Sequence, residues 1–176
     1  VVSSKQELIH PTISANNETL LYTEGNQDNG QTEIVTINLS NGVKRVVTLE
    51  NNRFGAIPQF NSTGDKIVYA SWRSDSLGQM STPTISVYDM TIGVTEDLQL
   101  GNEECWRPVY WNNDSEILYI QKDASTGKFV IRSYSLQDHN ITTILACDYD
   151  IWDITISPSN RYIAYAGNES GNWNLY

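Results

Sequence analysis

The chain has 176 residues, which is enough for one domain with its own core and too few for two domains of ordinary size. Hydrophobic residues make up 39% of the chain and charged residues 18%, a composition typical of a folded protein. The formal net charge is −10, so we expect neither nucleic acid nor an anionic membrane surface as a partner, because both attract clustered Lys and Arg. We also expect no transmembrane segment, since no apolar run approaches the length of about 18 residues that a membrane-spanning helix needs.

The chain repeats one short pattern four times. Each copy begins with a proline or an isoleucine, and a large apolar residue follows two positions later. In the four copies this pattern begins at Pro11, Pro58, Pro108 and Ile154. A polar turn comes next (SANN, NSTGD, NNDS, SPSN), followed by an apolar run that ends in tyrosine (LLY, IVY, ILY, IAY). Repetition with a period of about 50 residues is typical of the blades of a β-propeller.

Each copy is predicted to form four short β-strands and no helix. The first strand contains the Pro-x-apolar element, and the second strand is the run that ends in tyrosine. The third strands are the alternating stretches at 33–39, 85–90, 129–136 and 172–176. The fourth strands, which follow turns rich in Gly, Asn and Asp, lie at 43–49, 94–100 and 141–146. We therefore predict one all-β domain over 1–176, with copies at roughly 4–50, 51–102, 103–148 and 149–176.

The second strands are apolar on both faces, as the runs at 67–70 and 163–166 illustrate. A strand in a sheet with one solvated face would alternate, so we expect these sheets to be covered on both sides. The blades of a propeller meet this condition because each lies between two neighbours. A β-sandwich is the competing explanation, but a sandwich does not require self-similar units.

The second copy, PQFNSTGDKIVYASWRSD followed by ISVYDM, resembles the repeat of the TolB-type β-propellers. The pattern of that repeat is P-x-[apolar]-S-P-D-G-x-x-I-A-[FY]-x-S-x-R, and it also occurs in the propellers of prolyl-oligopeptidase-class and tricorn-type peptidases. The fourth copy keeps Ser157 and Pro158 but lacks the leading proline, while the first and third keep that proline and the second strand. The resemblance covers nearly the whole chain and concerns the fold, because such propellers serve many unrelated functions.

The resemblance implies a ring of about six to eight four-stranded antiparallel blades, with the first strand of each blade innermost along a central channel. Since this chain supplies about four blades, we expect it to form part of a larger propeller. The alternative is a closed four-bladed ring, in which residues 1–3 pair beside Leu175. Open blade edges and faces would also permit self-association.

Candidate binding residues lie in the segments that connect one copy to the next. In a propeller these segments gather on one face, here called the upper face, together with the loops between the second and third strands. The segments NEECWR and DYDIWD interleave aromatic side chains with carboxylates, which suits a sugar, a cationic peptide or a protein side chain. The candidate residues are Glu104, Trp106, Arg107, Asp150, Trp152, Asp153 and His10. The competing interpretation is that Trp106 and Trp152 wedge between adjacent blades while the carboxylates are solvated.

The sequence gives little support for a metal site. The histidines are His10 and His139, and we place His139 in a turn on the opposite face, so the two cannot share a metal ion. His10 precedes Pro11 at a position that lines the channel. The acidic pairs in the connecting segments lack the alternating spacing of a calcium-binding loop. We therefore expect no metal ion and no cofactor.

Nucleophilic catalysis has equally little support. The chain contains no GxSxG motif, and the surroundings of Cys105 and Cys147 suggest no activated thiol. Both cysteines precede a first strand, in neighbouring copies, so the alternatives are a disulfide between adjacent blades or two unpaired thiols. The sequence thus indicates a chain that is not itself an enzyme.

These observations lead to two hypotheses of function. The first is a non-catalytic TolB-like scaffold in the periplasm or at the cell surface, which binds protein or glycan through its upper face. The second is the substrate-gating propeller of a larger serine peptidase of the prolyl-oligopeptidase or tricorn class, whose catalytic domain is not in this chain. A propeller-fold lyase or hydrolase that acts on sugars would need a histidine-rich metal cluster, which the sequence does not supply.

Overall fold

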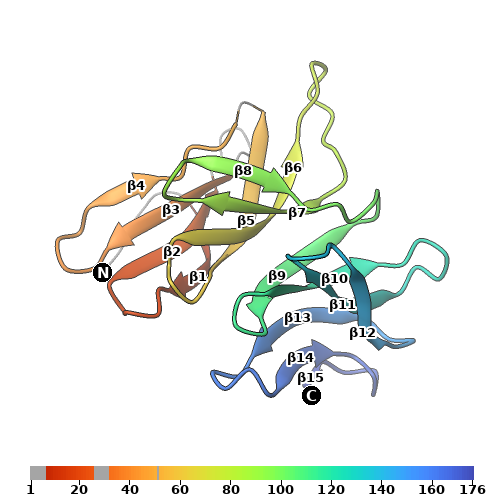
Figure 1. Ribbon diagram of the computed structural model, residues 1–176. Helices are drawn as coiled ribbons and strands as arrows, with labels where there is room; N and C mark the ends of the chain where they lie inside the picture. The colour runs from red at the N-terminus through yellow and green to blue at the C-terminus, as the bar shows by residue number, and fades with distance from the viewer. Residues whose placement is uncertain (1–6, 26–31, 51) are drawn as a thin grey trace.

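The computed structural model describes residues 7–25, 32–50 and 52–176. The regular secondary structure of these residues consists of β-strands (Figure 1). The first sheet consists of β1 (Glu7–Ile13), β2 (Thr19–Gly25), β3 (Thr32–Asn38) and β4 (Lys44–Val46). The second consists of β5 (Arg53–Phe60), β6 (Lys66–Arg73), β7 (Thr84–Asp89) and β8 (Val94–Asp97). The third consists of β9 (Cys105–Trp111), β10 (Glu116–Lys122), β11 (Phe129–Ser135) and β12 (Ile141–Ala146). The fourth consists of β13 (Ile151–Ile156), β14 (Ile163–Gly167) and β15 (Asn174–Leu175).

Each sheet is an antiparallel meander in which the strands pair in chain order. The predicted four-stranded blades are therefore confirmed for the first three copies, and the fourth copy contributes three strands. Because Glu7 pairs with Gly25, the start of a first strand and the end of a second strand lie at the same end of the blade. This end forms the upper face, as predicted.

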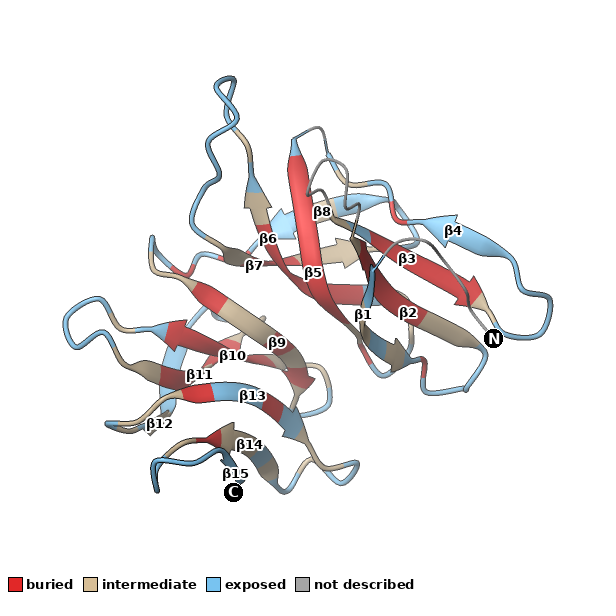
Figure 2. Ribbon diagram, turned by 180° about the vertical axis from the view of Figure 1, so that it is seen from behind, coloured by how far each residue is buried: buried red, intermediate tan, exposed pale blue. Residues whose placement is uncertain are grey.

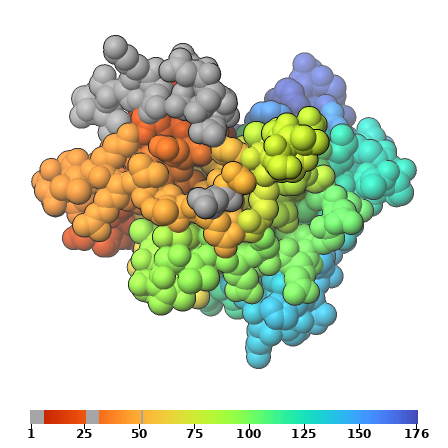
Figure 3. Space-filling view, turned by 90° about the horizontal axis from the view of Figure 1, so that it is seen from above, coloured from red at the N-terminus to blue at the C-terminus, as the bar shows by residue number. Residues whose placement is uncertain are grey.

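The four blades surround a common axis with their first strands innermost. β1 contacts β5, β5 contacts β9, and β9 contacts β13, so the first strands meet one another across the blades. The outermost strands β4, β8 and β12 are largely exposed (Figure 2). Seen from above, the first blade and the last two blades lie on opposite sides of the molecule (Figure 3). The architecture is the predicted β-propeller, with the first strands along the channel.

The apolar second strands hold the blades together. In the second blade Val68 and Ala70 are fully buried and pack against Tyr110 and Tyr119 of the third blade. The third blade packs in the same way on the fourth through Leu118 and its neighbours. Burying such side chains stabilises the fold by about 1.5–3 kcal/mol each. On the other face Ile67 and Tyr69 are buried against Leu21 and Ile34 of the first blade, so the strand at 67–70 is covered on both faces, as predicted.

In the fourth blade, one face is not covered by another blade of the described residues. Ala164 is exposed, and Leu175, which pairs with Ala166 of the same strand, is 83% exposed. The equivalent face of the second blade is covered by the third, whereas no further blade packs on this face among the residues that the structure describes. The alternative of a ring closed by residues 1–3 lies outside the described residues.

No helix in the described part of the chain has the length and apolar character that crossing a membrane requires.

Candidate binding site at the propeller axis

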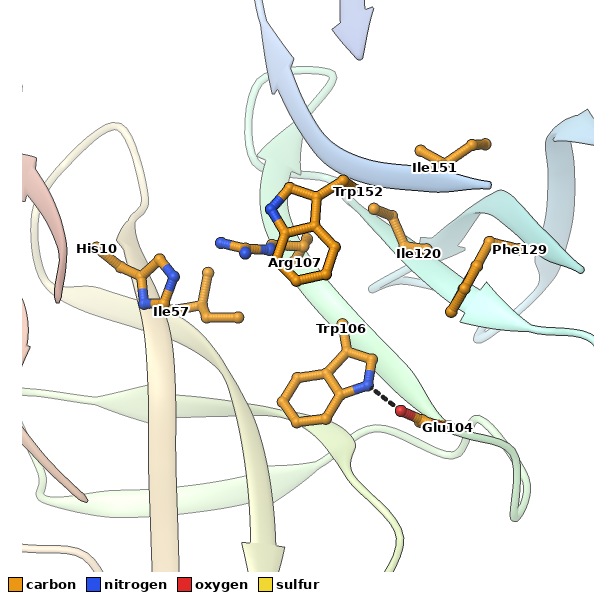
Figure 4. A pocket seen from close by; sticks show the side chains of 9 residues that line it. All are labelled: His10, Ile57, Glu104, Trp106, Arg107, Ile120, Phe129, Ile151 and Trp152. Carbon is orange, nitrogen blue, oxygen red and sulfur yellow. Dashed lines mark hydrogen bonds between the residues drawn. The ribbon is translucent and has the colours of Figure 1, made fainter. Parts of the chain in front are cut away.

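A pocket of about 440 Å³, here called the axial pocket, opens where the first strands meet (Figure 4). All four blades contribute to its wall, which is mainly apolar. It is lined by His10, Ile57, Glu104, Trp106, Arg107, Ile120, Phe129, Ile151 and Trp152. Five of the seven residues proposed from the sequence therefore lie together in one pocket. They come from three blades that are separated along the chain by tens of residues.

The pocket depends on a repeated irregularity in the first strands. His10, Ile57 and Arg107 each precede a proline, and each has a positive φ of 54° to 57°. A residue before proline is disfavoured in the right-handed helical region, and a single left-handed residue produces a β-bulge that redirects a side chain. The pairing of each strand with its neighbour is interrupted at this point. The bulges place these three equivalent side chains at the wall of the pocket.

In the fourth blade the position equivalent to Arg107 is Asp153, which is followed by Ile154 instead of proline. Asp153 lies next to the pocket, with its Oδ2 3.9 Å from Nη1 of Arg107. The Arg107 side chain is only 13% exposed, whereas that of Asp153 is 54% exposed. Since the pair is partly hydrated, it contributes modestly to stability and mainly balances the charge of Arg107.

Asp150 is the one proposed residue that the structure places elsewhere. Its backbone N–H donates to Oδ1 of Asn168 at 2.8 Å, and its Oδ2 accepts from Nδ2 of the same side chain at 3.4 Å. These bonds join the start of β13 to the end of β14. Asp150 therefore connects two strands and does not line the axial pocket.

Trp106 both lines the pocket and packs between blades. Its Nε1–H donates to Oε1 of Glu104 at 2.6 Å, which fixes the orientation of the indole. Its ring centroid lies 5.9 Å from that of Trp72 in the second blade. The competing interpretation of a tryptophan wedged between blades thus holds for Trp106, although one part of the ring still faces the cavity.

Trp152 does not wedge between blades, because it is 63% exposed. The guanidinium carbon of Arg107 lies 5.3 Å from the centroid of its ring, in a cation–π arrangement. Trp173, from the loop before β15, approaches the ring edge-on at 6.4 Å. Trp152 therefore presents a supported but solvent-accessible aromatic surface at the mouth of the pocket.

His10 is the titratable group most affected by this environment. Burial lowers the pKa of His10 below its usual value, the Arg107 guanidinium lowers it further, and the Asp153 carboxylate opposes the shift. The imidazole is therefore uncharged at neutral pH. Its Nδ1 is buried and has no hydrogen-bond partner among the described residues.

No group of three or more His, Cys, Asp and Glu side chains in the described residues is arranged to hold a metal ion. His139 lies in the turn after β11, as predicted, and its Nδ1 is 2.7 Å from the hydroxyl of Tyr134. Both cysteines are free, so the alternative of an inter-blade disulfide is wrong. Burial raises the pKa of the Cys105 thiol to about 12 and also raises the pKa of Cys147, so neither is an activated nucleophile.

Sequence reasoning missed four apolar residues of the pocket: Ile57, Ile120, Phe129 and Ile151. Ile57 could have been found, because it precedes a proline at the position equivalent to His10 and Arg107. The other three lie in regular strands and carry no motif that marks them as pocket residues. Only the packing of the blades shows that they face a cavity.

Comparison with known proteins gives no matching family model and no similar curated protein. Among solved structures, TolB from Acinetobacter baumannii is similar with a TM-score of 0.78 and 17% identity, over 99% of this chain and 41% of that one. Putative TolB from Agrobacterium tumefaciens is similar with a TM-score of 0.76 and 15% identity, over 99% of this chain and 60% of that one. A puromycin-hydrolyzing peptidase of Mycobacterium tuberculosis is similar with a TM-score of 0.69 and 14% identity, over 97% of this chain and 29% of that one. The chain thus spans less than two thirds of each of these structures.

Proposed function

We propose that this chain, which has the fold of the TolB propellers, is a non-catalytic scaffold that binds protein or glycan ligands through its upper face. The observation that carries the proposal is the axial pocket, in which side chains of all four blades converge. Its volume of about 440 Å³ lies within the range of 300–1,000 Å³ that is usual for ligand pockets. Such a volume accepts one ring-sized group of a larger ligand.

The composition of the pocket supports binding. Ile57, Ile120 and Phe129 supply apolar contact, and a few polar groups at the rim supply orientation. None of the lining residues carries a hydroxyl or thiol that could act as a nucleophile. His10 therefore acts in this proposal as part of the pocket wall.

The indole N–H signals of the tryptophans test this proposal directly. In a ¹⁵N-labelled chain, the signals of Trp106 and Trp152 report on the pocket. Trp111 is an internal control, because its Nε1–H donates to the carbonyl of Asn160 on the opposite face. Signals are assigned with single Trp→Phe variants, and three probes are added at millimolar concentration: methyl β-glucoside, N-acetyl-phenylalanine amide and N-acetyl-lysine amide.

We expect at least one probe to shift the signals of Trp106 and Trp152 and to leave that of Trp111 in place. If no probe moves the two pocket signals, or if all three signals move together, the pocket is not a binding site and the proposal is wrong.

The second candidate function is the gating propeller of a larger serine peptidase, and the similarity to the mycobacterial peptidase supports it. The test uses the protein isolated from its natural source and a fluorophosphonate probe, which labels activated serines. Labelling of a protein that contains these blades would support the peptidase. A full-length protein that stays unlabelled, beside a labelled control peptidase, would contradict it.

The proposed location is the periplasm or the cell exterior, which the likeness to TolB propellers supports. Cell fractionation with an antibody against this chain tests the location. A signal confined to the cytoplasmic fraction would contradict it.

A further inference from the structure

The axial pocket interrupts a row of aromatic side chains that crosses three blades on the upper face. We call this set the aromatic row: Phe54, Trp72, Trp106, Trp152 and Trp173. On one side of the pocket, the ring centroids of Phe54 and Trp72 are 6.4 Å apart, and those of Trp72 and Trp106 are 5.9 Å apart. On the other side, the centroids of Trp152 and Trp173 are 6.4 Å apart.

The two tryptophans that flank the pocket occupy equivalent positions in successive copies. Trp106 precedes Arg107, and Trp152 precedes Asp153, so the same step of the repeat places both rings at the axis. Trp152 and Trp173 are 63% and 54% exposed, which leaves a wide aromatic surface open to solvent. Large exposed aromatic surfaces on a folded protein mark binding sites.

We propose that the aromatic row binds an uncharged oligosaccharide, with one sugar ring in the axial pocket and the adjoining rings against Trp152 and Trp173. This inference rests on the proposed function and specifies the ligand of the same site. Three properties of the site select an uncharged sugar over the other ligands.

The charges around the pocket disfavour an ionic ligand. Arg107 already holds the position over the ring of Trp152 that a ligand cation would take. Its own charge is balanced by Asp153 at 3.9 Å, so it offers little net attraction to an anion. Glu104 in the wall and the net charge of −10 oppose a polyanion such as a uronic acid chain.

The polar atoms of the wall disfavour a purely apolar protein side chain. Such a ligand would cover the rim groups Glu104 and Arg107 without offering them a hydrogen bond. Burying a polar group without a partner is costly, and a charged group is costlier. A sugar ring offers both an apolar C–H face for the indoles and hydroxyls that donate and accept.

The first measurement is a printed array that carries neutral, amino-sugar and uronic acid glycans, with the folded chain as the probe. Binding is then quantified by calorimetry with a neutral trisaccharide and with trigalacturonate. Two variants are compared: Trp152→Ala, which removes an exposed ring of the row, and Tyr162→Ala as the matched control. Tyr162 is 72% exposed and lies in the turn between β13 and β14, at the opposite end of the blade.

We expect binding to neutral glycans that weakens about tenfold in Trp152→Ala and changes by less than about twofold in Tyr162→Ala. Tighter binding of trigalacturonate, or equal loss in both variants, would overturn the inference. If no glycan binds while N-acetyl-phenylalanine amide or N-acetyl-lysine amide shifts the signals of Trp106 and Trp152, the glycan is wrong and the binding function stands. If neither glycans nor probes bind, both are wrong.

Discussion

Arg53, at the start of β5, is the cation that we expect to matter most for the stability of the chain. Its side chain is only 2% exposed, and its guanidinium donates to both carboxylate oxygens of Asp97. Nη1 also donates to the hydroxyl of Ser86 at 3.0 Å. The guanidinium of Arg53 thus links the first strand of the second blade, β5, to its third strand, β7, and to its outermost strand, β8.

We predict that Arg53→Met lowers the free energy of unfolding by about 2–3 kcal/mol. Removing one partner of a fully buried ion pair costs about 3–5 kcal/mol. Asp97 is 41% exposed, however, so water replaces part of its lost interactions and the expected cost is smaller. Methionine has a similar length, which keeps the loss of packing small.

Arg73→Met provides a matched control. Arg73 binds the same Asp97, with Nη2 at 3.3 Å from Oδ2, but its side chain is 46% exposed. Its ion pair should therefore contribute less than about 1 kcal/mol. The measurement is urea unfolding of both variants and the parent chain, followed by tryptophan fluorescence and analysed with a common slope. Equal losses in the two variants would refute the reasoning that burial makes the difference.

Three further predictions concern packing, pH and thiol reactivity. Gly55→Ala should destabilise the chain by about 1–3 kcal/mol in the same urea assay, because an added Cβ would lie 2.7 Å from the buried ring of Tyr69; an unchanged midpoint would contradict this. The pKa of His10 is lower in the folded chain than its ordinary value of 6.5, so the contribution of His10 to stability is present above that pH and is lost as the pH falls below it. His10→Asn, which tolerates the positive φ, should therefore reduce the loss of stability between pH 7 and about 5.5, and an unchanged loss would count against the assignment. With an aromatic disulfide reagent, half-buried Cys147 should react well before buried Cys105 in the native chain, and both should react at similar rates in denaturant.

Much of the site could be inferred from the sequence because the repeat fixes equivalent positions. Once Pro11, Pro58 and Pro108 are aligned, the residues before them must occupy the same place in successive blades. That reasoning led to His10 and Arg107 and would have led to Ile57. The composition of the connecting segments was a less exact guide: Asp150 stands in the same segment as Trp152, but it is hydrogen-bonded to Asn168 and does not line the pocket. A side-chain hydrogen bond with a residue 18 positions away leaves no mark in the local pattern.

The two tryptophans show the same limit more clearly. Trp106 and Trp152 occupy equivalent positions, yet one packs against Trp72 and the other is exposed. The difference arises from the preceding blade. Trp106 packs against Trp72 of the second blade, whereas Trp152 lies against Arg107 of the third. The sequence alone could not choose between a wedge and an open binding surface.

The sequence by itself determined the number of blades, the order of their strands and the burial of the second strands in the first three blades. These features depend on local periodicity and on turn residues, and they recur in each copy. Only the tertiary structure decided which side chains meet at the axis, that the fourth blade leaves Leu175 exposed, and that Arg53 is buried in an ion pair. Those outcomes depend on contacts between blades, where partners lie tens of residues apart and a repeated unit meets a different neighbour each time.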